Sequence, residues 1–401
     1  MQDNLISIKN LNILLPEGSD RKFAVKNINL DIKAGETVCV VGESGSGKSL
    51  TARAVMGLLP APHVRVENGE IIFGKKDLVK IDYETIRQIR GSEISMIFQE
   101  PMTALNPVMS IGSQIDEIFR FHVSMSYKER RSKAIELLQN VNLPDPYQIV
   151  NSYPHELSGG QRQRAMIAMA LALSPKLLIA DEPTTALDVT TEAQILKLIK
   201  DMQKRYNSGV LFITHDFGVV ADIADRVIVM QDGLLVETGN VKQVLNNPIH
   251  SYTKSLIAAV PSLIPRKPRN NSKDVVLKVN NLNKTFGGGK SFLGFGKNAR
   301  VVKAVDNVSI ELFKGETLGV VGESGSGKST LARCIIKLLK SDDGNVLLNG
   351  EEITSLSRNE MRLHRKKIQM VFQDPFASLN PRNKVGKIIA QGPLTQGFSK
   401  K

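Results

Sequence analysis

Apolar residues in this chain occur either as short continuous runs or at helical spacing. Short, partly β-branched runs at 37–41, 177–180 and 210–214 predict buried strands. The stretch 48–59 follows the first run, stops before Pro60, and predicts a helix. Because strands alternate with helices, the pattern favours an α/β fold with a largely parallel sheet.

Two local signals predict further elements. Ser126 and Glu129 have the spacing of a capping box, which predicts the start of a helix. The apolar positions behind them fall on one helical face: Ala134, Leu137, Leu138 and Val141. Asp232-Gly233, between the apolar runs 227–230 and 234–237, predicts a β-hairpin.

The chain contains an internal repeat. The nine residues Val41–Ser49 (VGESGSGKS) recur without change at Val321–Ser329, each after a strand-like apolar run. The segment 95–101 (SMIFQEP) returns at 369–375 as QMVFQDP, and both copies continue to Leu-Asn-Pro. We therefore predict two related units in tandem.

The unit boundary is predicted from a Pro-, Asn- and Arg-rich linker at 263–274, which leaves domains at 1–262 and 275–401. Glycines between 287 and 296 predict a flexible loop inside the second unit. The motifs of the first unit continue to His215, whereas nothing equivalent to the sequence beyond about residue 107 follows in the second. We therefore expect the second unit to be incomplete, either in a fragment or in a truncated gene product.

Composition limits the class of protein. The chain has 401 residues, 41% of them hydrophobic, and the polar residues 1–4 precede no long apolar run, so neither a membrane span nor a signal peptide is expected. Cys39 and Cys334 lie far apart, which predicts neither disulfide nor metal site and fits the cytosol. The net charge of +13 is compatible with a solvated surface, a membrane or partner contact, or nucleic acid.

Both repeated segments fit the pattern GxxxxGK[ST], whose backbone N–H groups surround phosphate oxygens. Lys48 and Lys328 are positioned for the β- and γ-phosphates, and Ser49 and Ser329 for Mg²⁺. The predicted nucleotide-binding residues are Gly42, Glu43, Ser44, Gly45, Ser46, Gly47, Lys48 and Ser49, and in the second unit Gly322, Glu323, Ser324, Gly325, Ser326, Gly327, Lys328, Ser329 and Thr330.

Further polar motifs follow in the first unit. A predicted strand ends in Asp181 and Glu182, which suit orientation of a Mg²⁺ shell and polarisation of an attacking water. Leu157-Ser158-Gly159-Gly160-Gln161 is by itself compatible with an ordinary turn, and His215 with a structural histidine.

Taken together and in this order, the motifs resemble the ATP-binding subunits of ABC transporters. The resemblance implies a P-loop ATPase domain with a helical subdomain, followed by a partial second copy, with ATP and Mg²⁺ as ligands. The implied motifs are Walker A at 42–49, the glutamine loop at Gln99, the signature at 157–161, Walker B at 177–182, the D-loop at 186–188 and the switch histidine His215.

The resemblance also implies roles for individual residues. Glu182, His215 and Gln99 would be catalytic, and the predicted Mg²⁺ ligands are Ser49, Gln99, Asp181, Ser329 and Gln373. The signature residues Ser158, Gly159, Gly160 and Gln161 would face a nucleotide bound to an opposing ATPase domain. Phe23 and Phe286 are candidates for stacking on adenine, with a core or loop role as the open alternative.

The segments 98–107 and 372–381 resemble the ATPases of importers for peptides, glutathione, nickel and similar solutes, and 248–253 resembles the tail element of that family. This implies a tail at about 235–262, a separate membrane permease received by the helical insertion near 104–157, an indirect solute-binding partner outside the membrane, and a peripheral place on the cytoplasmic face of the bacterial plasma membrane. No iron–sulfur cluster and no nucleic acid are expected.

In this superfamily each ATP lies between two domains, and neither site is complete within this chain. We therefore expect weak turnover or none unless another chain or subunit supplies the remaining groups. We also expect a raw sheet edge in the second unit, that is, an edge strand whose backbone N–H and C=O groups are unpaired. Two other functions stay open: a tandem ATPase that acts on ribosomes or nucleic acid, and a catalytically silent nucleotide-binding fragment.

Overall fold

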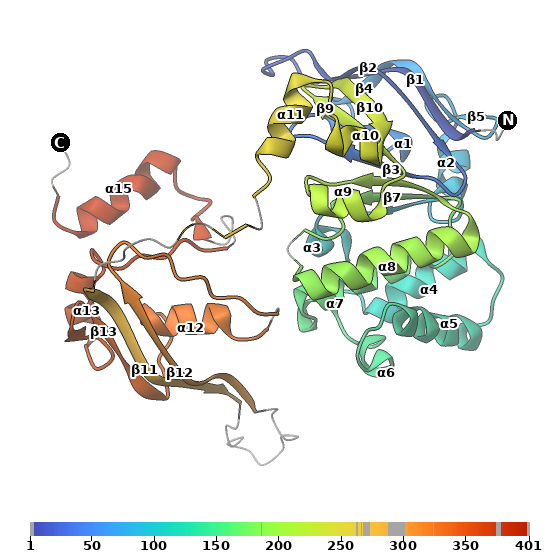
Figure 1. The fold of residues 1–401 in the computed structure, drawn as a ribbon. Coiled ribbons are helices and arrows are strands. Elements are labelled where there is room, and N and C mark those ends of the chain that lie inside the picture. Colours follow the sequence, from blue (N-terminus) through green and yellow to red (C-terminus); the bar gives the residue numbers. More distant parts are fainter. Residues whose placement is uncertain are drawn as a thin grey trace. The chain divides into compact units, whose positions relative to one another are not determined.

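The computed structural model describes residues 4–185, 187–261, 264–265, 267, 273–287, 301–323, 325–373 and 378–398. The chain divides into two compact units, Met1–Arg266 (unit 1) and Lys267–Lys401 (unit 2). Each unit is built around strands and helices of its own, which Figure 1 labels.

Unit 1 contains an antiparallel sheet with the strand order β2-β1-β4-β5. Its strands are β1 (Asn4–Leu14), β2 (Phe23–Lys33), β4 (Arg65–Phe73) and β5 (Lys76–Asp77). Alternate residues of β1 are buried, Ile6 and Ile8 before a register shift and Leu11 and Ile13 after it, as expected for a sheet with one covered face.

A second, six-stranded sheet has the order β10-β9-β3-β8-β7-β6. Its strands are β3 (Thr37–Val41), β6 (Ile94–Ile97), β7 (Leu177–Asp181), β8 (Gly209–Ile213), β9 (Arg226–Gln231) and β10 (Leu234–Asn240). All neighbours pair in parallel except β9 and β10, which form an antiparallel hairpin. Every residue of β3, β7 and β8 is buried, because both faces of this sheet are covered.

The helices of unit 1 cover these sheets in two layers (Figure 1). They are α1 (Lys48–Val55), α2 (Tyr83–Ile89), α3 (Pro101–Ala104), α4 (Ile111–His122), α5 (Tyr127–Asn140), α6 (Pro146–Ile149), a 3₁₀ turn (Pro154–Glu156), α7 (Gly159–Ala170), α8 (Val189–Tyr206), α9 (Phe217–Ile223), α10 (Val241–Asn246) and α11 (Ser251–Ala258). Helix α1 packs in the core between the two sheets. The longer helices α4, α5, α7 and α8 pack against the other face of the parallel sheet.

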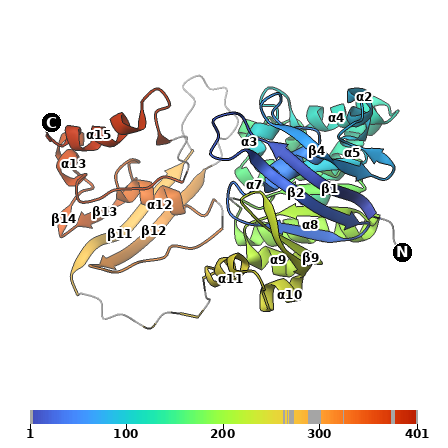
Figure 2. The same cartoon turned by 90° about the horizontal axis from the view of Figure 1, so that it is seen from above.

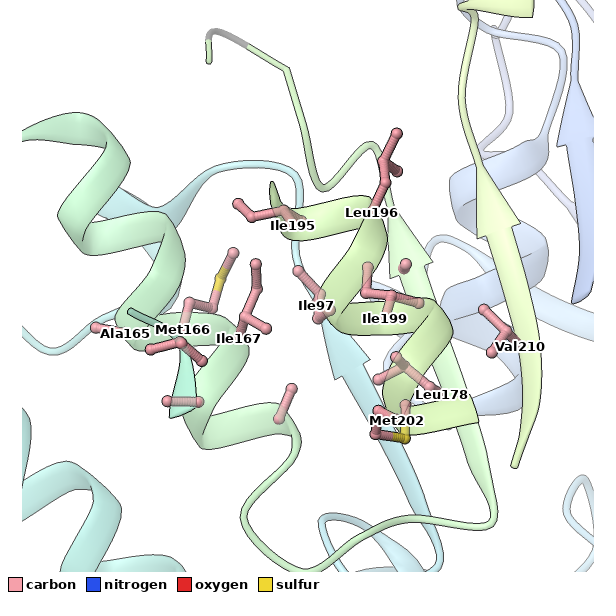
Figure 3. Close-up of a cluster of buried hydrophobic side chains, with 14 of the residues drawn as sticks. Ile97, Ala165, Met166, Ile167, Leu178, Ile195, Leu196, Ile199, Met202 and Val210 are labelled. Carbon is pink, nitrogen blue, oxygen red and sulfur yellow. The ribbon is translucent and has the colours of Figure 1, made fainter. Parts of the chain in front are cut away.

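Side chains of neighbouring strand positions divide between these two cores. In β7, Leu177 and Ile179 belong to the core between the sheets, whereas Leu178 and Ala180 belong to the core under the helices. Figure 3 shows Leu178 and Val210 of the strands beside Ile199 and Met202 of α8. The short strands are therefore fixed on both faces, which holds the loops at their ends in place.

The predicted elements of unit 1 are largely confirmed. The strands at 37–41, 177–180 and 210–214 correspond to β3, β7 and β8, and the hairpin turn at Asp232-Gly233 has positive φ at both residues. The capping box is present, with Ser126 and Glu129 bonded in both directions, and the predicted face of α5 is buried. The predicted helix 48–59 is too long, because the chain leaves α1 after Val55 and Gly57 adopts φ 61°.

Unit 2 contains one antiparallel sheet with the order β12-β11-β13-β14. Its elements are β11 (Val275–Phe286), β12 (Val302–Phe313), α12 (Lys328–Ile335), β13 (Asp343–Leu348), β14 (Glu351–Glu352), α13 (Arg358–His364) and α15 (Val385–Thr395). Figure 2 shows α12 lying along this sheet. The small core of unit 2 is centred on Val279, Leu282, Leu331 and Val346.

The strand predicted before the second glycine-rich loop is wrong. Residues 317–321 are not in a strand, and Val320 and Val321 are 51% and 93% exposed. In unit 1 the equivalent strand β3 bonds to β8 and β9, and the described part of unit 2 contains no counterpart of either. Within the residues of unit 2 that the structure describes, the expected raw sheet edge is therefore not formed at this position, because a strand without neighbours has no partner for its backbone groups.

Candidate functional site

Four of the candidate groups of unit 1 lie at the carboxyl ends of parallel strands. The loop 42–49, which we call phosphate loop 1, follows β3; Gln99 follows β6; Asp181 ends β7; and His215 follows β8. Because β3, β8, β7 and β6 are neighbours in the sheet, these loops meet at one edge. Ligands of open α/β sheets bind at this edge.

Phosphate loop 1 curls around the ammonium group of Lys48. Lys48 Nζ donates to the carbonyl oxygens of Gly42 at 2.7 Å and of Glu43 at 2.8 Å. Lys48 is only 5% exposed. Burial lowers the pKa of Lys48, and the carboxylates of Glu182, Asp181 and Glu43 oppose that effect. A nearly buried ammonium at the N-terminus of α1 suits an anionic oxygen ligand.

Ser49 and Asp181 form the second part of the site. The Ser49 hydroxyl donates to Asp181 Oδ1 at 2.9 Å, although the two residues are 132 positions apart in the sequence. Asp181 is 1% exposed. Burial raises the pKa of Asp181, and the Ser49 hydrogen bond opposes that effect. A buried carboxylate beside a hydroxyl is the oxygen donor set that Mg²⁺ prefers, so these two side chains fit the ion.

Glu182 is the centre of a third cluster. Its Oε2 accepts hydrogen bonds from Gln99 Nε2 at 3.0 Å and from Thr185 Oγ1 at 3.1 Å. His215 Nδ1 lies 3.4 Å from Glu182 Oε1. Glu182 adopts φ 46°, and its N–H donates to the carbonyl of Ile213 in β8 at 2.9 Å. The structure thus brings together Gln99, Glu182 and His215, which sequence motifs had singled out separately; Thr185 was not predicted.

The predicted signature residues make local hydrogen bonds, and among the described residues none of these bonds reaches phosphate loop 1. Ser158 caps α7, and its backbone and side chain exchange hydrogen bonds with Gln161. A side chain at Gly160 would approach Leu187 and Thr191 near the start of α8, and Gly159 has open space beside it. The signature therefore forms a capped helix N-terminus.

Sequence reasoning missed Gln163. Its side chain is 2% exposed and its Nε2 donates to the carbonyl of Pro183, the residue after Glu182. This bond joins the signature helix to the Glu182 segment. The only sequence signal was a polar residue at a helical position that should face the core, and such a residue needs a buried hydrogen-bond partner.

The described part of unit 2 repeats the lysine contacts of the glycine-rich loop, but not the carboxylate that accompanies this loop in unit 1. Lys328 Nζ donates to the carbonyls of Gly322 at 2.6 Å and Glu323 at 2.7 Å, as Lys48 does in unit 1. However, Ser329 and Gln373 are exposed. Within the described part of unit 2, no carboxylate is hydrogen-bonded to Ser329 as Asp181 is to Ser49. The described part of unit 2 therefore keeps the Lys328 contacts of a phosphate loop and lacks the acidic half of the site.

The aromatic candidates occupy facing positions of equivalent hairpins. Phe23 starts β2 opposite Leu14, whereas Phe286 ends β11 opposite Val302. The ammonium of Lys22 lies 5.0 Å from the Phe23 ring centre, and that of Lys284 lies 5.7 Å from the Phe286 ring centre. The two rings thus come from opposite strands of the hairpin, which explains why they do not align in sequence.

Several predictions fall on residues outside the described ranges. These are Ser324, Ala186 of the predicted D-loop, most of the predicted linker at 263–272, and the glycines at 288–296. In the ranges that the structure does describe, no helix is both long and apolar enough to cross a bilayer.

Comparison with known proteins places these features in a family. The ABC transporter family model matches residues 25–185 and 305–396, and the model of the oligopeptide/dipeptide transporter C-terminal region matches residues 236–295. The chain is 45% identical to the glutathione import ATP-binding protein GsiA of Salmonella paratyphi A, over 97% of this chain and 67% of that protein. It is 47% identical to the peptidoglycan transport ATP-binding protein YejF of Agrobacterium fabrum, over 97% of this chain and 70% of that protein.

A solved structure agrees. The ATP-binding cassette MJ0796, determined as a dimer in a post-hydrolysis state with ADP and phosphate, is 31% identical with a TM-score of 0.54, over 59% of this chain and 98% of that one. Fold, motif order and sequence identity thus agree, and the chain belongs to the ATP-binding subunits of ABC transporters, with the P-loop ATPase fold of that family.

Proposed function

We propose that unit 1 binds the triphosphate of ATP in phosphate loop 1 and hydrolyses it to drive import of a small solute through a separate membrane permease. The observation that carries this proposal is the convergence of Lys48, the Ser49–Asp181 pair and the Glu182 cluster at one sheet edge. The domain limits that go with it are 1–262, including a tail from about 235, and 275–401 for the second ATPase domain.

The chain's own groups suit the steps of phosphate transfer. Lys48, whose ammonium group the Gly42 carbonyl holds in place, binds the β- and γ-phosphate oxygens and offsets their negative charge. Glu182 accepts the proton of a water that attacks the γ-phosphorus, while the bond to the ADP oxygen breaks. Gln99 and His215, which already touch Glu182, position that water and the γ-phosphate.

Ser49 and Asp181 hold the Mg²⁺ ion in this proposal, with Gln99 as a further oxygen donor. When bound, the ion neutralises charge on the β- and γ-phosphates. In unit 2, Ser329 and Gln373 are the proposed equivalents beside Lys328. The buried Asp181 carboxylate is the group whose environment most favours a cation, because burial without one disfavours its charged form.

The signature belongs to a second nucleotide in this proposal. Ser158 and the N–H groups of Gly159 and Gly160 face solvent at the start of α7, where the helix dipole favours an anion. The partner is a second ATPase domain, either unit 2 completed by further groups or another chain. Turnover then depends on that partner, because among the described residues Ser158 bonds to Gln161 and Lys48 bonds within its own loop.

The permease contact is proposed at a groove of about 500 Å³ between α2, α4 and the segment after α3. Gln114 holds the floor of this groove through hydrogen bonds to Asn106 and to the Met109 carbonyl. Phe121 is 43% exposed at its rim, under the Arg87 guanidinium. A permease helix bound in this groove would contact Ala104 and Asn106, which follow Gln99 closely in the sequence. With this contact, the proposed location of the protein is peripheral, on the cytoplasmic face of the membrane.

The proposed solute is a small peptide-like molecule such as glutathione, because the relatives that cover almost the whole chain are named for glutathione import and peptidoglycan transport. A solute-binding protein outside the membrane would deliver it to the permease.

The proposal is tested by nucleotide binding in the full chain. Lys328→Ala is placed in every sample, so that only phosphate loop 1 is measured with a non-hydrolysable ATP analogue. Lys48→Ala should then weaken Mg²⁺-dependent affinity by about 10- to 100-fold, the worth of charge-assisted hydrogen bonds. Lys128→Ala, an exposed lysine on α5, is the control. Absence of magnesium-dependent binding by the parent would refute the ATP site.

A further inference from the structure

Helix α11 reaches the phosphate loop through one side chain. The backbone N–H of Glu43 donates to the hydroxyl oxygen of Tyr252 at 3.0 Å, across 209 positions of sequence. Tyr252 lies in the first turn of α11, within the region that matches the transporter C-terminal family model. Helices α10 and α11 lie beside β9 in both Figure 1 and Figure 2, so the tail is packed near the end of the parallel sheet.

The hydrogen bond acts on a rigid group that also faces Lys48. The carbonyl of Gly42 and the N–H of Glu43 belong to the same peptide unit, which is planar and points its two polar atoms in opposite directions. Tyr252 binds the N–H edge at 3.0 Å, and Lys48 Nζ binds the carbonyl edge at 2.7 Å. Rotation of this plane would break both contacts together.

The loop has little other freedom at this point. Gly42 has φ 151°, and a side chain there would lie 2.1 Å from the carbonyl oxygen of Met230 in β9. The next turn of the loop is held from the same side, because the N–H of Gly233 donates to the Ser46 carbonyl at 3.1 Å. Met230 and Gly233, which come much later in the sequence, thus pack against phosphate loop 1 and restrict its backbone.

Tyr252 is itself held in place. Glu237 of β10 is 8% exposed and accepts hydrogen bonds from the N–H groups of Ile249 at 2.8 Å and His250 at 3.0 Å, just before α11. The Tyr252 ring packs against the core under the helices. Burial raises the pKa of Tyr252, with the Glu43 hydrogen bond opposing it, so the phenol stays neutral at physiological pH.

We propose that Tyr252 is a positioning residue, which fixes the Gly42–Glu43 peptide plane and thereby the direction from which Lys48 meets the phosphates. The inference rests on the proposed ATP site and adds to it a link between the C-terminal tail and nucleotide affinity. Glu237 supports this link by fixing the start of α11.

The test uses the full chain with Lys328→Ala in every sample and titration with a non-hydrolysable ATP analogue and Mg²⁺. Tyr252→Phe keeps the ring and removes only the hydroxyl. We expect its dissociation constant to rise about fivefold, the effect of one neutral hydrogen bond. Tyr147→Phe, 65% exposed on α6, is the matched control and should leave the dissociation constant unchanged. The melting temperature of nucleotide-free Tyr252→Phe should stay within about 2 °C of the parent.

A double-mutant cycle separates positioning from general destabilisation. Glu237→Gln should weaken binding when Tyr252 is present, and the double variant should bind no worse than Tyr252→Phe alone. The inference is overturned if Tyr252→Phe binds as the parent does, if its effect simply adds to that of Glu237→Gln, or if it appears only with a large loss of melting temperature. A parent that binds no nucleotide refutes the ATP site instead, so the two failures are distinguishable.

Discussion

Replacing Glu182 with glutamine removes one charge from the proposed site while keeping the shape of the side chain. In the structure the carboxylate accepts from Gln99 at 3.0 Å and from Thr185 at 3.1 Å, and His215 lies 3.4 Å from its other oxygen. A glutamine amide has only one oxygen, so it keeps the donors on one side and places an N–H₂ group on the other.

Two effects of this change differ in size. Loss of one partly exposed hydrogen bond costs about 1 kcal/mol of folding free energy, which corresponds to about 2–4 °C in melting temperature for a unit of this size. Loss of a general base costs about 10²- to 10⁴-fold in rate, or about 2.7–5.4 kcal/mol of activation free energy. The variant should therefore fold and bind ATP almost as the parent does, and fail mainly in hydrolysis.

The assay is single-turnover release of phosphate from ATP, with the full chain in an assembly that hydrolyses ATP. ATP affinity is measured separately by titration and should stay within about threefold of the parent. Thr185→Ala serves as the control, because it removes a hydrogen bond to Glu182 and leaves the carboxylate. A hydrolysis rate within tenfold of the parent would show that Glu182 is not the base. Loss of ATP affinity comparable to the loss of rate would instead assign it to binding.

Two further changes test the surroundings of this site. Asp181→Asn should raise the melting temperature of the nucleotide-free protein by about 2–4 °C at neutral pH. Folding raises the pKa of the buried Asp181 carboxyl above its ordinary 3.8, so the parent loses stability as the pH rises from 3.8 through the folded-state pKa, and asparagine does not. The gain should vanish below about pH 4, Mg²⁺ should no longer strengthen ATP binding, and equal melting curves across pH would contradict the reasoning. Gln163→Ala leaves the Pro183 carbonyl without its hydrogen-bond donor and should lower the free energy of unfolding by about 2 kcal/mol, measured by urea denaturation. Gln139→Ala, on an exposed face of α5, is the control. Equal denaturation midpoints for the two variants would show that the buried hydrogen bond does not contribute to stability.

Much of the fold of unit 1 could be predicted, because its signals are local. Thr37–Val41 is one threonine followed by four apolar residues, so it forms a strand buried on both faces wherever it finds neighbours. The capping of α5 by Ser126 and the turn at Asp232-Gly233 depend on backbone geometry within a few residues. Such features need no information from the rest of the chain.

Unit 2 shows where local prediction fails. The sequence at 317–321 has the same strand character as β3, yet it forms no strand and leaves Val321 93% exposed. A parallel strand is stabilised by neighbours that arrive from distant parts of the sequence, and the described part of unit 2 offers none in the positions of β8 and β9.

The motifs by themselves determined the kind of chemistry and the residue types, because loop curvature, charge and spacing around Lys48 are encoded within a few positions. Only the tertiary structure decided which of these residues meet: it placed Ser49 against Asp181, and Gln99 and His215 against Glu182, through the order of the strands that carry them. It also brought Tyr252 to the phosphate loop and Gln163 to Pro183, since a hydrogen bond between distant segments depends on packing that no local pattern contains.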